Sequence, residues 1–163
     1  MKQLAIVWQR LVDETGQTCE RCGTTYEEIQ KALEPLKKAL EPFAIDVTFE
    51  QREMDQTAFA NDPSQSNRVW VGGKPLEEWL GAQVGQSPCC DICGDAECRT
   101  IEVDAKIYES IPTDLIIKAG LMAASHLYGD IPLGKNYREP HAVKPTMNRC
   151  CDCSESNPDK VIT

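Results

Sequence analysis

The feature that most constrains this chain is a pair of thiols, Cys19 and Cys22, separated by two residues. A short apolar run, Leu4–Val12, precedes the pair, and a segment with helical periodicity follows it. The apolar run predicts a buried strand, so the thiols are expected between a strand and a helix. At the start of a helix, the peptide dipoles and the free N–H groups stabilise a thiolate.

This placement favours thiol–disulfide exchange, with Cys19 as the attacking thiolate and Cys22 as the thiol that resolves the mixed disulfide. The same spacing also forms half of many zinc sites, so a pair of metal ligands is the alternative. Arg21 lowers the pKa of a neighbouring thiol, whereas Glu20 raises it. Because these two effects largely offset each other, no strongly acidic thiol is expected.

Composition limits the classes of partner and the compartment. The chain has 163 residues, nine cysteines and a net charge of −9. The acidic balance argues against nucleic acid and anionic membranes as partners. An odd number of cysteines argues against a disulfide framework, and the N-terminus leads into the first strand without a secretory pattern. The expected location is therefore cytoplasmic, where cysteines act as catalytic or metal-binding thiols.

A helix is expected after the first thiol pair. Thr24 and Thr25 lie three residues before Glu27 and Glu28, which is the spacing of a capping box. An apolar stripe follows over residues 29–43. Pro35 falls inside this stripe and is expected to kink or break the helix.

The remaining elements are predicted from periodicity and turn residues. They are a strand at 45–50 parallel to the first, helical turns at 55–60, a strand and glycine turn at 68–76, a short helix at 77–80, a hairpin over 100–109 and a helix at 115–128.

The order β-α-β followed by β-β-α is the thioredoxin-like arrangement. It predicts an α/β fold with one mixed sheet flanked by helices, in which the last strands pair antiparallel and the final helix packs on the sheet. The expected domain spans 1–129 with a Cys-rich insertion at 86–99, and an irregular Pro- and Cys-containing tail spans 130–163. One position departs from the thioredoxin pattern, since Ser66 or Asn67 stands where thioredoxins carry a proline before the third strand.

A second thiol cluster lies in the insertion: Cys89, Cys90, Cys93 and Cys98. Short loops of this kind wrap one tetrahedral ion, so zinc or another thiophilic metal is the expected cofactor. An iron–sulfur centre fits less well, because the spacing reverses the plant-type ferredoxin order. Adjacent cysteines rarely bind one ion, which leaves Cys89 for another role. The insertion is expected to approach Cys19 and Cys22.

A third group of thiols, Cys150, Cys151 and Cys153, lies in the tail. Vicinal thiols weakly resemble the C-terminal pair by which mercuric reductases pass on mercury. Thiolates are soft ligands, so Cu(I), Zn(II), Hg(II) and As(III) are candidate ions. The alternative is a tail whose cysteines are incidental.

The motifs taken together resemble the DUF2703 family over residues 2–128. They are Ile6–Leu11, Thr18–Gly23, Ser66–Trp70, Gly73–Leu80 and the thiol cluster from Pro88 to Arg99. That family consists of small prokaryotic, thioredoxin-like proteins without an assigned function. The resemblance therefore implies the fold and the importance of the cysteines, and it implies no substrate.

Two functions remain open from the sequence. The first is a thioredoxin-like thiol protein that exchanges disulfides with protein partners through Cys19 and Cys22, with the insertion as an accessory metal or redox centre. The alternative is a protein that binds soft metal ions or an iron–sulfur cluster without turnover. It would use Cys19, Cys22, Cys90, Cys93 and Cys98 as ligands.

Overall fold

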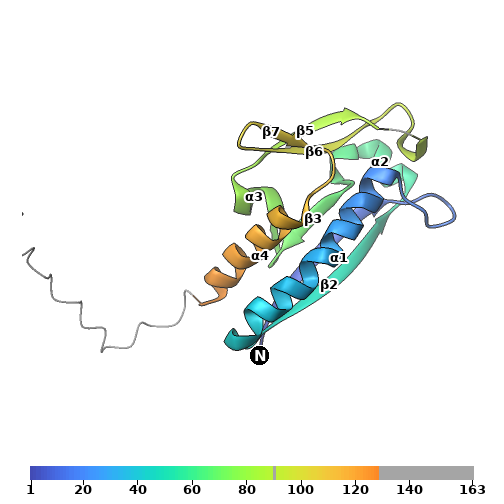
Figure 1. Ribbon diagram of the computed structural model, residues 1–163. Helices are drawn as coiled ribbons and strands as arrows, with labels where there is room; N and C mark the ends of the chain where they lie inside the picture. Colours follow the sequence, from blue (N-terminus) through green and yellow to red (C-terminus); the bar gives the residue numbers. More distant parts are fainter. Residues whose placement is uncertain (90, 129–163) are drawn as a thin grey trace, which may run out of the picture. The chain divides into compact units, whose positions relative to one another are not determined.

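The computed structural model describes residues 1–89 and 91–128, which lie within one compact unit, Met1–Ile131 (Figure 1). The elements, with 3₁₀ helices labelled η, are β1 (Lys2–Leu11), α1 (Glu20–Leu40), η1 (Glu41–Phe43), β2 (Ile45–Met54), α2 (Gln56–Asn61), η2 (Pro63–Gln65), β3 (Arg68–Val71), β4 (Lys74–Pro75), α3 (Leu76–Leu80), β5 (Gln83–Pro88), η3 (Asp91–Cys93), β6 (Glu97–Val103), β7 (Lys106–Tyr108) and α4 (Thr113–Tyr128). In this part of the chain, every helix is too short or too polar to cross a bilayer.

The first sheet has the strand order β2-β1-β3-β4. β1 pairs with β2 in parallel, from Lys2 opposite Ile45 to Leu11 opposite Met54, which confirms the predicted parallel pair. The long helix α1 makes the crossover between these two strands, as parallel pairing requires. β3 pairs antiparallel with β1 on its other side and with the short β4.

Helices α1 and α4 lie against one another and contact this sheet (Figure 1). Alternate residues of β1, namely Leu4, Ile6 and Trp8, are almost completely buried, as expected for one face of a strand that packs on helices. The two helices approach closely at Gly120, where an added Cβ would lie 2.8 Å from a methyl carbon of Leu36. The absence of a side chain at position 120 therefore permits this contact.

The helix after the thiol pair begins earlier than the capping-box pattern predicted. It starts at Glu20 with Cys19 at the N-cap, so the expected cap at Thr24 or Thr25 is wrong. The carboxylate of Glu28 is instead an acceptor for the backbone N–H and hydroxyl of Thr113, at 2.9 Å and 2.6 Å. Glu28 thus stabilises the first turn of α4, because its carboxylate accepts a hydrogen bond from a backbone N–H group that has no partner within that helix.

Pro35 does not break α1, which continues to Leu40. Its ring lies on the exposed side of the helix, whereas Ala32 and Leu36 on either side are buried. Burial of the apolar face stabilises the helix across the position where proline removes one backbone hydrogen bond.

The expectation of a single sheet is wrong, because the described residues form two sheets. Gly72 and Gly73 have positive φ values of 59° and 81° and reverse the chain at once, so the two-residue β4 is the last strand beside β3. The predicted hairpin exists as β6 and β7 but belongs to a second sheet, ordered β5-β6-β7. Its third strand, β5, comes from a small and polar segment for which no strand was predicted.

Candidate metal centre

The first thiol pair lies at the start of α1, as the sequence predicts. Cys19 is the N-cap residue in an extended conformation, and Cys22 lies in the first turn. Both side chains are buried, with 5% and 1% of their surface exposed. The pair therefore occupies the position at which a helix N-terminus stabilises negative charge.

The second thiol cluster lies in the connection between β5 and β6. These strands pair from Gln83 opposite Glu102 to Pro88 opposite Glu97, so the connection returns on itself. η3 places Cys93 inside the turn, and Gly94 with a φ of 58° continues the reversal. α2 supports the turn, because the side chain of Gln56 donates to the carbonyl of Ile92 at 3.1 Å.

Four sulfur atoms from these two parts of the chain form one cluster. The Sγ atoms of Cys19, Cys89 and Cys93 all lie within 4.8 Å of one another. Cys89 Sγ lies 3.7 Å from Cys19 Sγ, and Cys98 Sγ lies 3.0 Å from Cys93 Sγ. These four cysteines are free thiols and can hold a metal ion. We call them the thiol cluster.

Two of the sulfur separations are close to those of a tetrahedral thiolate site, whereas Cys98 lies outside the group of three sulfurs that are within 4.8 Å of one another. Zn–S bonds of about 2.3 Å place neighbouring sulfurs about 3.8 Å apart in a tetrahedron. The Cys19–Cys89 separation of 3.7 Å already matches this edge. The Cys93–Cys98 separation of 3.0 Å is shorter than the edge and longer than a disulfide bond, so these two sulfurs need to move apart by less than 1 Å.

The thiol pKa values differ across the cluster. The pKa of Cys19 is lowered to about 5, chiefly because the Cys22 thiol hydrogen-bonds to its sulfur, with further bonds from Cys89 and Cys93. The expectation that no strongly acidic thiol would occur is therefore wrong. Burial raises the pKa of Cys93, and burial also raises the pKa of Cys98, to about 12. A metal ion that binds here must displace protons from these thiols.

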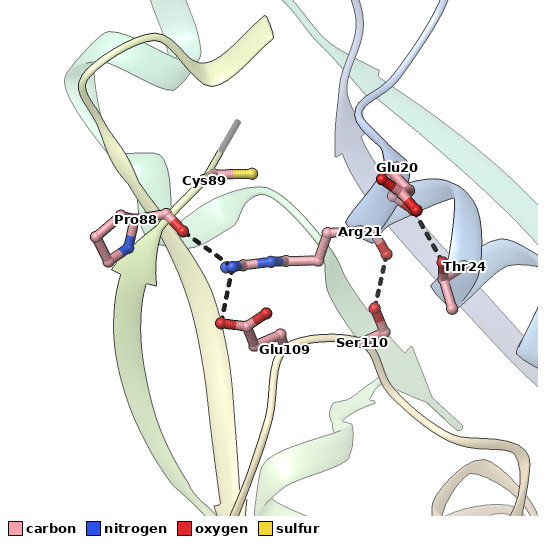
Figure 2. A pocket seen from close by; sticks show the side chains of 7 residues that line it. All are labelled: Glu20, Arg21, Thr24, Pro88, Cys89, Glu109 and Ser110. Carbon is pink, nitrogen blue, oxygen red and sulfur yellow. Dashed lines mark hydrogen bonds and ion pairs between the residues drawn. The ribbon is translucent and has the colours of Figure 1, made fainter. Parts of the chain in front are cut away.

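Arg21 does not act on the thiol pair as the sequence predicted. Its guanidinium donates to the carbonyl of Pro88 at 3.0 Å and pairs with Glu109 at 3.0 Å. Ser110 donates to the Arg21 carbonyl at 3.1 Å. Figure 2 shows these contacts between the start of α1 and the end of β5, and Cys89 is the next residue after β5. Arg21 therefore fixes the distance between Cys19 and Cys89, a role that no local pattern in the sequence indicates.

An open pocket of about 510 Å³ lies beside Cys89. It is lined by Glu20, Arg21, Thr24, Pro88, Cys89, Glu109 and Ser110 (Figure 2). Cys89 is partly exposed, whereas Cys19, Cys93 and Cys98 are buried. Cys89, a predicted metal ligand for which another role was also left open, is thus a member of the cluster and its most accessible sulfur in the described part of the chain.

Ser66 occupies the position beside Cys22 where the sequence departs from the thioredoxin pattern. Its hydroxyl lies 3.9 Å from Cys22 Sγ and accepts the backbone N–H of Leu11 at 3.0 Å. The neighbouring Asn67 has a φ of 54° and accepts the indole N–H of Trp8 at 3.1 Å. Both polar side chains are therefore used to join β1 to the start of β3.

Four of the predicted thiols lie outside the described residues. Cys90 belongs to the insertion, and Cys150, Cys151 and Cys153 belong to the tail. Their proposed roles as ligands or transfer thiols stay predictions.

Comparisons with known proteins give one family model and one similar protein. The family model described as "Domain of unknown function (DUF2703)" matches residues 4–120, which confirms the resemblance seen in the sequence. An uncharacterized protein of Archaeoglobus fulgidus is 47% identical over 114 residues, which cover 70% of this chain and 82% of that protein. No solved structure matches the chain. With more than half of its length matched by the family model, this protein belongs to the DUF2703 family.

Proposed function

We propose that this protein binds a thiophilic metal ion, zinc in the first instance, through the thiolates of Cys19, Cys89, Cys93 and Cys98. The observation that carries the proposal is the 3.7 Å separation of the Cys19 and Cys89 sulfurs, which come from residues 70 positions apart in the chain. Such a contact between distant thiols requires the tertiary fold to bring them together. Thiolate ligands select soft or borderline ions such as Zn(II), Cu(I), Hg(II) and As(III).

The surroundings of the cluster support a bound cation. Buried thiolates repel one another, and their charge needs compensation in a medium of low dielectric constant. The N-terminus of α1 supplies part of this compensation at Cys19. In the proposed site, a bound divalent cation supplies the remaining positive charge. The proposal retains the expected cytoplasmic location, because a reducing compartment keeps cysteines as free thiols.

Metal content tests this proposal. The chain is purified without oxygen after Cys150, Cys151 and Cys153 are replaced by serine, so that the tail thiols contribute nothing. We expect one zinc ion per chain by elemental analysis, with four more thiols that become titratable after a chelator removes the ion. A reduced protein that takes up no stoichiometric zinc, copper or mercury would contradict the proposal.

A second candidate function is thiol–disulfide exchange on a thioredoxin-like scaffold. The strand order β2-β1-β3-β4, the helices α1 and α4 against that sheet, and a Cys-x-x-Cys pair at the start of α1 support this reading. In this role the sulfur of Cys19 attacks a partner's disulfide and Cys22 releases the product.

Reduction of a protein disulfide tests the second candidate. The metal-free, reduced chain is expected to reduce the disulfides of insulin at a rate that Cys19→Ser abolishes. Cys98→Ser is the matched control, because it removes a buried thiol of the cluster outside the Cys-x-x-Cys pair. Equal rates for Cys19→Ser and the unchanged chain would exclude Cys19 as the attacking group.

A further inference from the structure

Cys19 has sulfur neighbours of two kinds. Cys22 lies in the first turn of the helix that Cys19 caps, and its thiol lowers the pKa of Cys19. On the other side, Cys89 and Cys93 lie within 4.8 Å of the Cys19 sulfur. Neither Cys22 nor Cys98 is a member of this group of three, and Cys98 joins the proposed ligands through its 3.0 Å contact with Cys93. A sulfur in a disulfide carries no negative charge and is a poor metal ligand. Cys19 can therefore belong to the metal site or to a disulfide with Cys22, and these two states exclude each other.

We infer that oxidation of Cys19 and Cys22 by a small-molecule disulfide expels the metal ion, so that the protein releases its metal in response to disulfide. This inference rests on the proposed metal-binding function and adds its regulation. The thiol pair then controls the metal site, and Cys22, which lies outside the proposed ligand set, makes the release lasting because it takes over the disulfide from Cys89.

The geometry of the pair suits this disulfide. Residues three apart on a helix have Cβ atoms roughly 5–6 Å apart, and an N-cap residue has extended φ and ψ values that let its side chain turn toward the helix. Disulfides form when the Cβ atoms lie about 3.5–4.5 Å apart, so the two side chains must approach each other by roughly 1–2 Å. Cys19 has the extended N-cap conformation, with φ −69° and ψ 161°. The pair therefore needs little rearrangement to close.

The pocket beside Cys89 lets a small-molecule disulfide approach the thiol cluster. Cys19 and Cys22 are 5% and 1% exposed, so a disulfide cannot reach them directly. Cys89 is partly exposed, lines the pocket of about 510 Å³, and lies 3.7 Å from Cys19. Figure 2 shows its sulfur on the side of the pocket where α1 begins. Cys89 is therefore the first sulfur that an incoming disulfide meets.

The exchange proceeds in three balanced steps. Cys89 attacks the small disulfide, forms a mixed disulfide and releases one thiolate. Cys19 then attacks the Cys89 sulfur, which releases the second thiolate and leaves a Cys19–Cys89 disulfide. Cys22 finally attacks the Cys19 sulfur, so that Cys89 leaves as a thiolate. Two electrons pass from Cys19 and Cys22 to the small disulfide. The two thiolates released from the small disulfide take up the proton of Cys22 and one proton from water.

Release of zinc on oxidation tests this inference. The full chain with serine at the three tail cysteines is loaded with zinc and mixed with excess oxidised glutathione beside a chromophoric zinc indicator. We expect one equivalent of zinc to appear, with a Cys19–Cys22 disulfide in the peptide map. Cys22→Ser is expected to bind the same amount of zinc and, when reduced glutathione is added after release, to take the ion back at least about 10-fold faster than the unchanged chain, because its Cys19–Cys89 disulfide cannot pass on to the buried Cys22.

The controls separate this inference from the function on which it rests. If neither the unchanged chain nor Cys22→Ser takes up zinc when reduced, the proposed metal-binding function fails. If both bind zinc and regain it at equal rates after release, or if the peptide map of the unchanged chain shows Cys93–Cys98 as the disulfide formed, the inference is overturned. Cys22→Ala serves as a second variant, because a small apolar side chain suits this buried position. If Cys22→Ser and Cys22→Ala both fold and both fail to bind zinc, Cys22 is itself a zinc ligand, and this result would also overturn the inference.

Discussion

Replacement of Cys93 by serine is expected to lower the affinity for zinc by at least about 100-fold, more than the 10–100-fold typical of changes beyond the ligands themselves. Cys93 has the most sulfur contacts in the cluster. It lies within 4.8 Å of Cys19 and Cys89, and its sulfur is 3.0 Å from that of Cys98. A serine hydroxyl stays protonated at neutral pH and is a poor ligand for a soft ion. Competition for zinc with a chromophoric chelator measures the loss of affinity.

Cys22→Ser is the matched control for this prediction. It removes another buried thiol of similar size, next to Cys19 and outside the group of three sulfurs that lie within 4.8 Å of one another. Its zinc affinity is expected to stay within a factor of about 3 of the unchanged chain, which corresponds to less than about 1 kcal/mol. An unchanged affinity in Cys93→Ser would show that the metal is held by other thiols.

Replacement of Glu77 by leucine is expected to lower the free energy of unfolding by about 3–5 kcal/mol, the usual effect of removing one partner of a buried ion pair. Glu77 in α3 pairs with Arg99 in β6 and lies 3.6 Å from Arg68 in β3. The side chain of Arg99 is only 5% exposed, so its charge would be left buried without a partner. Urea denaturation of the reduced, metal-free protein measures the change.

Two further variants isolate the ion pair. Glu78→Leu changes the neighbouring, exposed carboxylate and is expected to shift stability by less than about 0.5 kcal/mol. The double variant Glu77→Leu/Arg99→Met is expected to recover at least about 1 kcal/mol relative to Glu77→Leu alone, because no buried charge remains unpaired. The single variant Arg99→Met completes the cycle, and strict additivity of Glu77→Leu and Arg99→Met in the double variant would refute the proposed energetic link between Glu77 and Arg99.

The Glu77–Arg99 pair also matters for the metal centre. Arg99 follows Cys98 directly and donates in addition to the carbonyl of Ser64 at 2.8 Å. These contacts attach β6 of the second sheet to η2 and α3 beside the first sheet. The position of Cys98 therefore depends on a buried charge pair whose members are 22 residues apart. Neither residue stands out in the sequence, because isolated Glu and Arg residues are usually exposed.

Several features of the site could be predicted from local sequence. The apolar run before Cys19 and the apolar stripe after Cys22 require a strand and a helix, so the thiol pair had to lie between them. The spacing of the thiols from Cys89 to Cys98 indicated a short loop with metal-ligand character. A parallel β-α-β unit followed from the length of the helix between two strands.

Other features depend on contacts that no local pattern encodes. The start of α1 at Glu20 was missed because Cys19 caps the helix without a side-chain hydrogen bond. The capping-box residue Glu28 proved to serve a different helix, α4. The strand β5 was missed because its residues are polar and largely exposed, and its pairing with β6 rests on backbone hydrogen bonds.

The sequence by itself determined which chemical groups this protein offers: soft sulfur ligands in two short motifs, each beside an element whose periodicity is plain. Only the tertiary structure decided which sulfurs meet, because that depends on how the second sheet lies against the start of α1. Arg21, bound to Pro88 and Glu109, establishes this contact across 67 residues of chain. The contact brings Cys89 within 3.7 Å of Cys19 and leaves Cys22 outside the group of three sulfurs that lie within 4.8 Å of one another.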